Sequence, residues 1–209
     1  MKTILCFGDS NTFGFNPRTE KRYSRSIRWP YVLQKILGDS YEVISEGFVG
    51  RTLASEDSTR PYYNGSKHIQ ALLKSHDPIG LVIITLGTNE IKDRYKLNAK
   101  GIAKNLEKVI LLIRDKKLGL EKSPKVLIVC PPPPAVPASG KVRVDMKRAP
   151  EIFKVLPTLY KEVARKYKCD YLNAGDYVSS GKFDGYHFDP EGHLGLAKVF
   201  AVRIKKMKI

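Results

Sequence analysis

Three side chains that together can perform acyl transfer lie at opposite ends of the chain: Ser10 near the start, and Asp184 and His187 near the end. A serine hydroxyl is a weak nucleophile unless a base removes its proton. A carboxylate three residues before an imidazole can orient the ring through one nitrogen and leave the other free to accept that proton. We therefore interpret Ser10, His187 and Asp184 as a candidate catalytic triad.

Each of these residues also has an ordinary interpretation. Gly8-Asp9-Ser10 is made of common turn residues, so this tripeptide alone is weak evidence for a nucleophile. Asp184 and His187, taken singly, are typical of surface turns. His193 competes with His187 for the role of base, but it falls at the opening of a helix, and we expect it to be structural.

The elements that must position these residues are short apolar runs that alternate with helical patterns. Strands are expected over residues 3–7, 41–44, 81–86, 125–130 and 170–173. Helices are expected over residues 31–37, 98–118 and 152–167, from 190 onward, and from a Ser66 cap to about residue 76. This alternation predicts a parallel sheet with right-handed crossovers. Ligands bind at the carboxyl edge of such a sheet, where Ser10 lies.

Two segments are less clear from their composition. Residues 135–150 are charged and flanked by prolines, and we leave their conformation and role open. Pro157 falls inside the pattern of the helix over 152–167. Because proline removes a backbone donor, Pro157 marks either the true start of that helix or a kink in it.

Four ordered strand-end motifs, which carry Ser, Gly, Asn and Asp-x-x-His, resemble those of the SGNH hydrolases, also called GDSL-type esterases and lipases. The similarity is greatest to the arylesterase and acyltransferase (perhydrolase-like) branch and covers nearly the whole chain. The segments that carry it are Phe7 to Ser10, Arg28-Trp29, Glu46 to Thr52, Leu86 to Asn89, Pro131 to Pro134 and Asp184 to His187. The resemblance implies a flavodoxin-like α/β/α sandwich of three layers around a five-stranded parallel sheet.

The resemblance also implies an oxyanion hole. It assigns to this hole the backbone N–H groups of Ser10 and Gly50 and the side-chain amide of Asn89, and such donors lower the barrier by roughly 3 kcal/mol each. Gly47 is a rival for the second position. We favour Gly50 because Arg51-Thr52 follows it, as in the branch that this chain resembles.

Two residues depart from the family pattern. Asn11 stands where many members carry Leu, and Glu90 stands where the family usually has Asp. Since Glu90 follows the amide assigned to the oxyanion hole, we expect the support behind that amide to differ from the family's. We do not expect either change to remove activity.

The branch implies a serine esterase that hydrolyses short-chain, acetyl-type esters through an acyl-serine intermediate, with an alcohol or peroxide sometimes replacing water. Aromatic side chains that flank the catalytic segments are candidates for a tight apolar pocket: Phe13, Phe15, Tyr186 and Phe188. For Phe13 and Phe188, packing in the core is an equal alternative. A carbohydrate deacetylase, an acyl-CoA thioesterase or a lysophospholipase of the same fold are alternative functions.

Length and residue types set further bounds. With 209 residues and 42% hydrophobic content, the chain can form one sizeable core, so we expect a single domain over residues 1–209. No apolar run approaches the roughly 18 residues of a membrane span. Three cysteines without metal-ligand spacing, and no glycine-rich phosphate motif, lead us to expect no metal, no cofactor and a cytoplasmic location.

The formal net charge of +16 makes a non-catalytic module that binds polyanions the alternative from another class. Lys and Arg are spread over nearly the whole chain, which favours a solvated basic surface. We therefore expect a small acyl ester as the partner, and neither nucleic acid nor a membrane. Relatives in this branch assemble through their loops, so the resemblance also points to a homo-oligomer.

Overall fold

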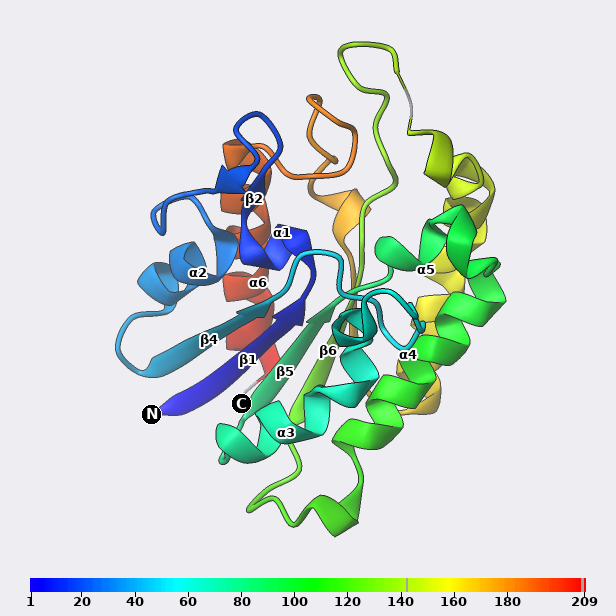
Figure 1. The fold of residues 1–209 in the computed structure, drawn as a ribbon. Helices are drawn as coiled ribbons and strands as arrows, with labels where there is room; N and C mark the ends of the chain where they lie inside the picture. The colour runs from blue at the N-terminus through cyan, green and yellow to red at the C-terminus, as the bar shows by residue number, and fades with distance from the viewer. Residues whose placement is uncertain (142, 208) are drawn as a thin grey trace.

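The computed structural model describes residues 1–141, 143–207 and 209. At its centre lies a five-stranded sheet with the order β4-β1-β5-β6-β7, in which all neighbouring strands are parallel (Figure 1). The strands are β1 (Lys2–Gly8), β4 (Tyr41–Gly47), β5 (Leu81–Thr85), β6 (Lys125–Cys130) and β7 (Asp170–Asn173). The five predicted strands are all present.

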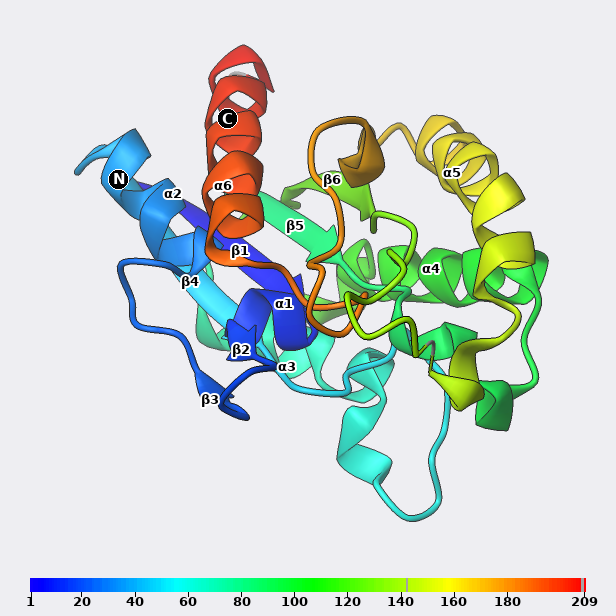
Figure 2. The ribbon, with the colours of Figure 1, turned by 90° about the horizontal axis from the view of Figure 1, so that it is seen from above.

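Helices cover both faces of this sheet, as Figure 2 shows from above. On one face lie α2 (Trp29–Leu37) and α6 (Pro190–Met207), and on the other lie α3 (Ile69–Ser75), α4 (Ala99–Ile113) and α5 (Ala149–Lys166). Side chains of a strand alternate between the faces, so Ile4 and Cys6 of β1 pack in one core cluster while Leu5 and Phe7 pack in the other. The predicted three-layer α/β/α fold is confirmed.

Several short elements were not predicted, and most of them lie at the carboxyl edge of the sheet. They include α1 (Ser10–Phe13) and a small antiparallel hairpin of β2 (Phe15–Asn16) and β3 (Lys21–Arg22). The 3-10 helices are η1 (Pro61–Tyr63), η2 (Gly65–Lys67), η3 (Asn89–Ile91), η4 (Asp93–Tyr95), η5 (Lys116–Leu118), η6 (Val144–Met146) and η7 (Ala174–Asp176).

The predicted start of α3 and the predicted end of α4 were wrong. Ser66 does not cap α3, because the Asn64 side chain accepts both the backbone N–H of Ser66, at 3.0 Å, and its hydroxyl, at 2.7 Å. This holds residues 65–67 in a 3-10 turn, and α3 begins only at Ile69. The α-helix expected over 98–118 ends at Ile113, and a separate 3-10 turn follows it.

Helix α5 begins earlier than predicted. Pro150 lies in its first turn, where a missing N–H costs nothing, and Pro157 lies inside the helix rather than at its start. The carbonyl of Pro157 accepts a hydrogen bond from the hydroxyl of Tyr171 at 2.9 Å.

Residues 135–150 lie alongside the loop that carries Asp184. Val142 lies outside the described residues. The Ala135 N–H donates to the Gly185 carbonyl at 2.9 Å, and the Ala138 N–H donates to the Lys182 carbonyl at 2.7 Å. A Cβ on Gly185 would lie 2.3 Å from the Ala135 carbonyl oxygen, so this close approach requires glycine. The segment therefore borders the carboxyl edge of the sheet.

Within the described residues, every helix is too short or too polar to cross a bilayer. The same part of the chain contains no group of three or more His, Cys, Asp and Glu side chains arranged to hold a metal ion.

Candidate active site

Strand β1 delivers Ser10 to the carboxyl edge of the sheet through a tight turn. Ser10 is the first residue of α1, and the Asp9 carboxylate caps this helix by accepting the Asn11 N–H at 2.9 Å. A Cβ on Gly8 would lie 2.0 Å from the Thr12 hydroxyl oxygen. Only glycine therefore permits the turn that places Ser10 here.

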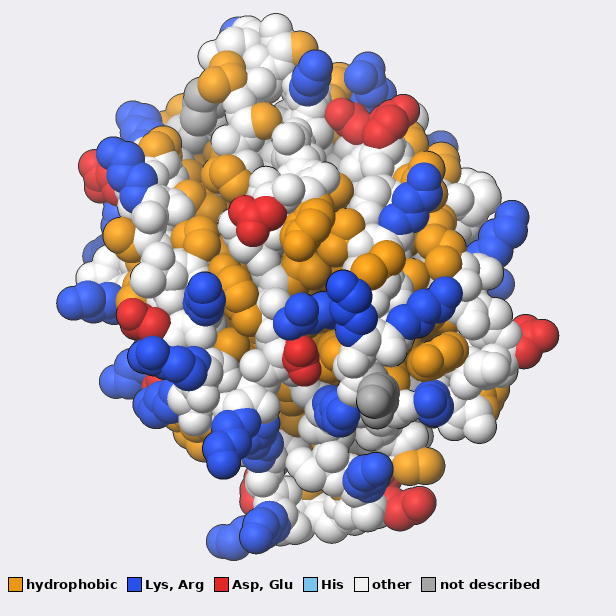
Figure 3. All heavy atoms as spheres, turned by 180° about the vertical axis from the view of Figure 1, so that it is seen from behind, with side chains coloured by type: hydrophobic (Ala, Val, Ile, Leu, Met, Phe, Trp, Pro, Cys, Tyr) orange, Lys and Arg blue, Asp and Glu red, His pale blue; other side chains and the backbone are white. Residues whose placement is uncertain are grey.

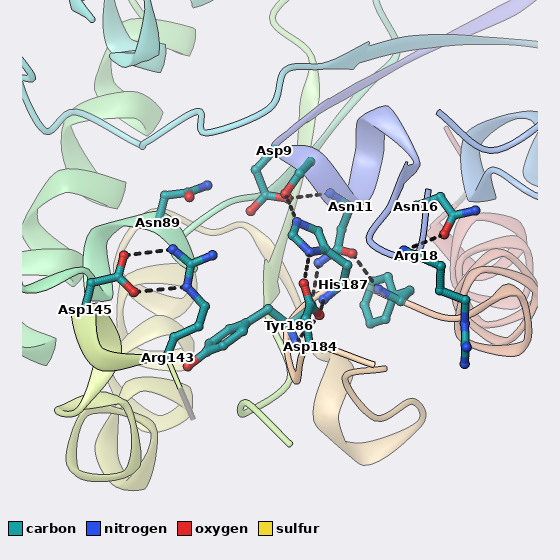
Figure 4. A network of polar contacts seen from close by, with 12 residues as sticks. Asp9, Asn11, Asn16, Arg18, Asn89, Arg143, Asp145, Asp184, Tyr186 and His187 are labelled. Carbon is teal, nitrogen blue, oxygen red and sulfur yellow. Dashed lines mark hydrogen bonds and ion pairs between the residues drawn. The ribbon is translucent and has the colours of Figure 1, made fainter. Parts of the chain in front are cut away.

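The loop before α6 brings the imidazole of His187 against Ser10. Its Nε2 lies 2.9 Å from Ser10 Oγ, and its Nδ1 lies 2.5 Å from Asp184 Oδ2 (Figure 4). The other carboxylate oxygen of Asp184 accepts the backbone N–H groups of Tyr186 and His187, both at 3.0 Å. The three residues predicted as a triad thus form one hydrogen-bonded chain, which is able to remove the serine proton.

The electrostatics of this chain keep Asp184 ionised. Partial burial acts to raise the pKa of its carboxyl group. Hydrogen bonds from the His187 ring and from the backbone of His187 and Tyr186 outweigh burial, and the pKa is lowered from its ordinary value. A carboxylate at this position stabilises the imidazolium that forms when His187 takes a proton.

Asn11 ties the serine turn to the histidine loop. Its Nδ2 donates to the Tyr186 carbonyl at 3.1 Å, and its Oδ1 accepts the Phe188 N–H at 2.9 Å. These two bonds join Asn11 to the residues before and after His187, so they hold the imidazole in position next to Ser10. From the sequence, Asn11 was noted only because it departs from the family pattern. Its side-chain partners are more than 170 residues away, and no local signal predicts them.

The two candidate glycines of the second strand end have different surroundings. Gly50 lines the same cavity as Ser10, with a φ of +83°, and a Cβ on it would lie 2.8 Å from the Tyr63 ring. Gly47 ends β4, where a Cβ would lie 2.1 Å from the backbone nitrogen of Phe13. Gly47 thus allows α1 to pack closely on the sheet, and Gly50 presents its backbone to the cavity.

Asn89 enters the cavity from the 3-10 helix that follows β5. Its Nδ2 donates one hydrogen bond to the Arg51 carbonyl at 3.0 Å, and its Oδ1 accepts a bond from Lys92 Nζ at 2.8 Å. These contacts fix the amide orientation and leave a second N–H on Nδ2 for a ligand. Lys92 was not predicted, although its position three residues after Asn89 on a turn is a signal that sequence reasoning can use.

Burial and neighbouring cations affect Lys92. Burial, followed by the charges of Arg94 and Arg143, lowers the pKa of its ammonium to about 8. Lys92 therefore remains largely protonated at neutral pH, while it is more easily deprotonated than a surface lysine.

Glu90 and Arg51 support the oxyanion side from behind. Glu90 is fully buried, its Oε1 accepts the Leu53 N–H, and burial raises the pKa of its carboxyl group to about 8. The Arg51 guanidinium donates to the Gly8 carbonyl at 3.1 Å, and its carbon Cζ lies 4.4 Å from the centre of the Phe7 ring. Burial lowers the pKa of this guanidinium to about 10. The loop that carries Gly50 is thus fastened both to β1 and to the Asn89 turn.

A cavity of about 330 Å³ brings these groups together. Its walls include Ser10, Gly50, Asn89 and His187. Of the four aromatic residues predicted to line a pocket, Phe15 and Tyr186 do so, and the Phe15 ring lies 4.7 Å from the His187 ring.

The other two aromatic residues lie away from the cavity. The Phe13 ring is covered by the Arg22 guanidinium at 4.1 Å. Phe188 is 3% exposed and packs in the core cluster beneath α6. Each follows a catalytic residue closely in sequence, but neither lines the cavity.

His193 packs among aromatic rings of the core, and neither of its ring nitrogens has a hydrogen-bond partner among the described residues. It is fully buried, and its ring lies 5.5 Å from that of Tyr23 and 5.7 Å from that of Phe188. Burial lowers the pKa of this imidazole to about 4. These surroundings favour a neutral, structural histidine.

Comparison with known proteins places these observations in a family. Residues 6–194 match the GDSL-like Lipase/Acylhydrolase family. The chain is 30% identical, over 97% of its length, to an acetylxylan esterase of Xylanibacter ruminicola, and it spans 43% of that protein. It superposes on a carbohydrate acetylesterase family member from Sinorhizobium meliloti with a TM-score of 0.91, at 32% identity and 99% coverage of both chains. The aryl esterase of M. smegmatis gives a TM-score of 0.91, at 31% identity and 99% coverage of both chains. The chain therefore belongs to the GDSL-like lipase/acylhydrolase, or SGNH, family and is a hydrolase of carboxylic ester bonds.

Proposed function

We propose that this esterase hydrolyses short-chain acyl esters through an acyl-serine intermediate. Ser10 is the nucleophile, His187 the general base and acid, and Asp184 the carboxylate that orients His187. The observation that carries the proposal is the 2.9 Å contact between His187 Nε2 and Ser10 Oγ, with Asp184 on the other ring nitrogen. This order of partners is what proton removal from a serine requires.

In the first half of the reaction, Ser10 Oγ forms a bond to the ester carbonyl carbon while its proton passes to His187 Nε2. The carbonyl oxygen becomes an oxyanion, which accepts hydrogen bonds from the backbone N–H groups of Ser10 and Gly50 and from Asn89 Nδ2. When the tetrahedral intermediate collapses, the bond to the alcohol oxygen breaks and His187 returns the proton to that oxygen. The alcohol leaves and the acyl group stays on Ser10.

In the second half, His187 removes a proton from a water molecule, whose oxygen attacks the acyl carbon. The same donors stabilise the second oxyanion, and its collapse releases the carboxylic acid and restores the Ser10 hydroxyl. An alcohol or peroxide in place of water gives acyl transfer by the same steps.

Two features of the site support a small acyl group. The cavity has a volume of about 330 Å³, at the lower end of the roughly 300 to 1,000 Å³ typical of ligand pockets. Phe15 lies against the His187 ring and Tyr186 stands beside it. A long acyl chain would have to displace one of these aromatic side chains.

The test is a series of 4-nitrophenyl esters of rising acyl length, measured on wild type, Ser10→Ala and Ser123→Ala. Ser123 is an exposed serine that does not line the cavity, so its variant controls for the loss of a serine hydroxyl elsewhere in the protein. We expect kcat/KM to fall as the acyl chain lengthens, and Ser10→Ala to lose turnover with little change in thermal unfolding. Turnover in Ser10→Ala would remove Ser10 as the nucleophile, and equal rates for all chain lengths would contradict the small pocket.

A second candidate substrate is an acetylated sugar. It is favoured by the acetylxylan esterase and the carbohydrate acetylesterase among the similar proteins. Acetyl release from an acetylated xylo-oligosaccharide, compared with hydrolysis of an aryl acetate and of acetyl-CoA, ranks these possibilities. Faster release from the sugar than from the other two would make the chain a carbohydrate deacetylase.

A further inference from the structure

Positive side chains crowd the cavity that contains Ser10. Four cations line it, from three separate segments of the chain, against one lining carboxylate: Arg60, Lys92, Arg94 and Arg143, with Asp145. Figure 4 shows Arg143 and Asp145 beside Asn89 and Tyr186 at the edge of this space. The ester proposed above must therefore bind within reach of several positive charges.

Only part of this charge is balanced by neighbouring carboxylates. Arg143 makes two hydrogen bonds to Asp145, at 3.0 and 2.8 Å, and Arg94 lies 3.4 Å from Asp57. Lys92 donates to an amide oxygen, which carries no charge. Among the residues that the structure describes, Arg60 has no carboxylate within ion-pair distance, and its guanidinium lies 5.6 Å from the Tyr63 ring.

The cations also act on one another. Arg94 and Arg143 both lower the pKa of Lys92, after burial, and Lys92 in turn helps to lower the pKa of Asp145. Neighbouring positive charges repel one another, and a bound anion would relieve this repulsion. On the rear face of the molecule, by contrast, Figure 3 shows Lys and Arg side chains dispersed among neutral ones.

On the basis of the proposed esterase function, we propose that the natural ester is anionic and that Arg60, Arg94 and Arg143 bind its negative group at the rim of the cavity. A carboxylate is the chemistry that best fits guanidinium groups, which present planar pairs of N–H donors. The carboxylate belongs either to the acyl half or to the alcohol half of the ester. Arg143 lies near Tyr186, which neighbours His187. Arg60 lies near Tyr63, whose ring is next to Gly50 on the oxyanion side.

Two matched pairs of substrates test this proposal and distinguish the two halves. For the alcohol half, kcat/KM is measured for 4-acetoxybenzoate and for its neutral analogue 4-acetoxybenzamide. For the acyl half, 4-nitrophenyl hydrogen succinate is compared with 4-nitrophenyl butyrate. For each enzyme we take the kcat/KM of the anionic ester divided by that of its neutral partner. The change in this ratio from wild type to variant is the result, because the difference in intrinsic reactivity between the two esters is the same in every enzyme.

We expect the ratio for one pair to fall about threefold in Arg60→Gln or Arg94→Gln, and about tenfold in the double variant, at low ionic strength. High salt should reduce the wild-type ratio for that pair in the same direction. The control is Lys161→Gln, which removes one exposed charge on α5 that does not line the cavity, and it should leave both ratios unchanged.

Ratios that stay constant in all variants would overturn the proposal, and so would an equal fall in Lys161→Gln. Hydrolysis of the neutral esters shows independently whether the esterase function itself holds. If neutral esters are hydrolysed by Ser10 while the ratios do not respond, only the anionic substrate is wrong.

Discussion

The two halves of the active site are held by different kinds of contact. In the half that contains His187, the carboxylate of Asp184 lies three residues from its imidazole and binds two backbone N–H groups of the same loop. In the half that contains Gly50 and Asn89, separate loops meet through buried side chains whose partners lie 37 to 43 residues away. The first half is largely local, whereas the second exists only in the folded chain.

This difference has an energetic counterpart. The supporting carboxylate of the local half has its pKa lowered, so its ionised form is stabilised by the fold. In the other half, burial raises the pKa of Glu90 and lowers those of Lys92 and Arg51, so the charged forms are disfavoured. The geometry of the oxyanion donors is thus maintained at a cost in folding stability. Variants in the two halves should separate these effects.

The largest effect is expected from Asp184→Asn in the local half. The amide loses the negative charge that stabilises the His187 imidazolium and can favour the wrong ring tautomer, so kcat should fall roughly 10³- to 10⁴-fold. Steady-state hydrolysis of 4-nitrophenyl acetate measures this, with Asp39→Asn as an exposed control. A loss of less than tenfold would show that the carboxylate does not act through His187.

Asn89→Ala should lower kcat about 10²- to 10³-fold, because it removes one donor to the oxyanion while leaving Ser10 and His187 in place. KM should change little, since this donor acts mainly in the transition state. Asn89→Asp, which has the same shape but presents an oxygen, should be at least as slow. Near wild-type activity in Asn89→Asp would rule out the amide as an oxyanion donor.

Glu90→Gln should change the pH dependence of stability more than activity. The folded-state pKa of Glu90, about 8, lies above its unfolded value. The stability it contributes is therefore fully present below about pH 4.5 and is lost as pH rises through about 8, by on the order of 5 kcal/mol.

Urea unfolding of wild type and Glu90→Gln at pH 5 and pH 9 measures this effect. Wild type should lose more free energy of unfolding than the variant between the two pH values. An equal loss in both proteins would show that Glu90 is not held protonated in the fold.

Lys92→Met should give the smallest effect, a fall of about tenfold in kcat, because the Asn89 amide keeps its bond to Arg51 but loses a charged donor to its oxygen. Because the pKa of Lys92 is lowered to about 8, wild-type kcat should also decline as pH rises through about 8. This decline should be absent in Lys92→Met. An identical pH profile above pH 7 in both proteins would contradict this role.

Sequence reasoning succeeded where the signal was local. Strands β1, β5 and β6 contain continuous apolar runs, and the Asp184 to His187 spacing is itself the geometry of an orienting pair. It failed for Ser66, which the Asn64 side chain holds in a 3-10 turn, and for the end of α4, after which the Asp115 side chain caps a separate 3-10 turn. It left the places of Phe13 and Phe188 open between pocket and core, and the structure packs Phe188 in the core and Phe13 against Arg22.

The amino-acid sequence by itself determined the order of strands and helices along the chain, the turn that carries Ser10 and the loop that pairs His187 with Asp184. Hydrophobic periodicity and glycine placement act over a few residues, so they can be read without coordinates. Only the tertiary structure decided that Asn11 bridges the two catalytic loops, that Lys92 and Arg51 hold Asn89, and that arginines from distant segments meet around one cavity. Such contacts join residues far apart in the chain, and their energies depend on burial that only the packed fold creates.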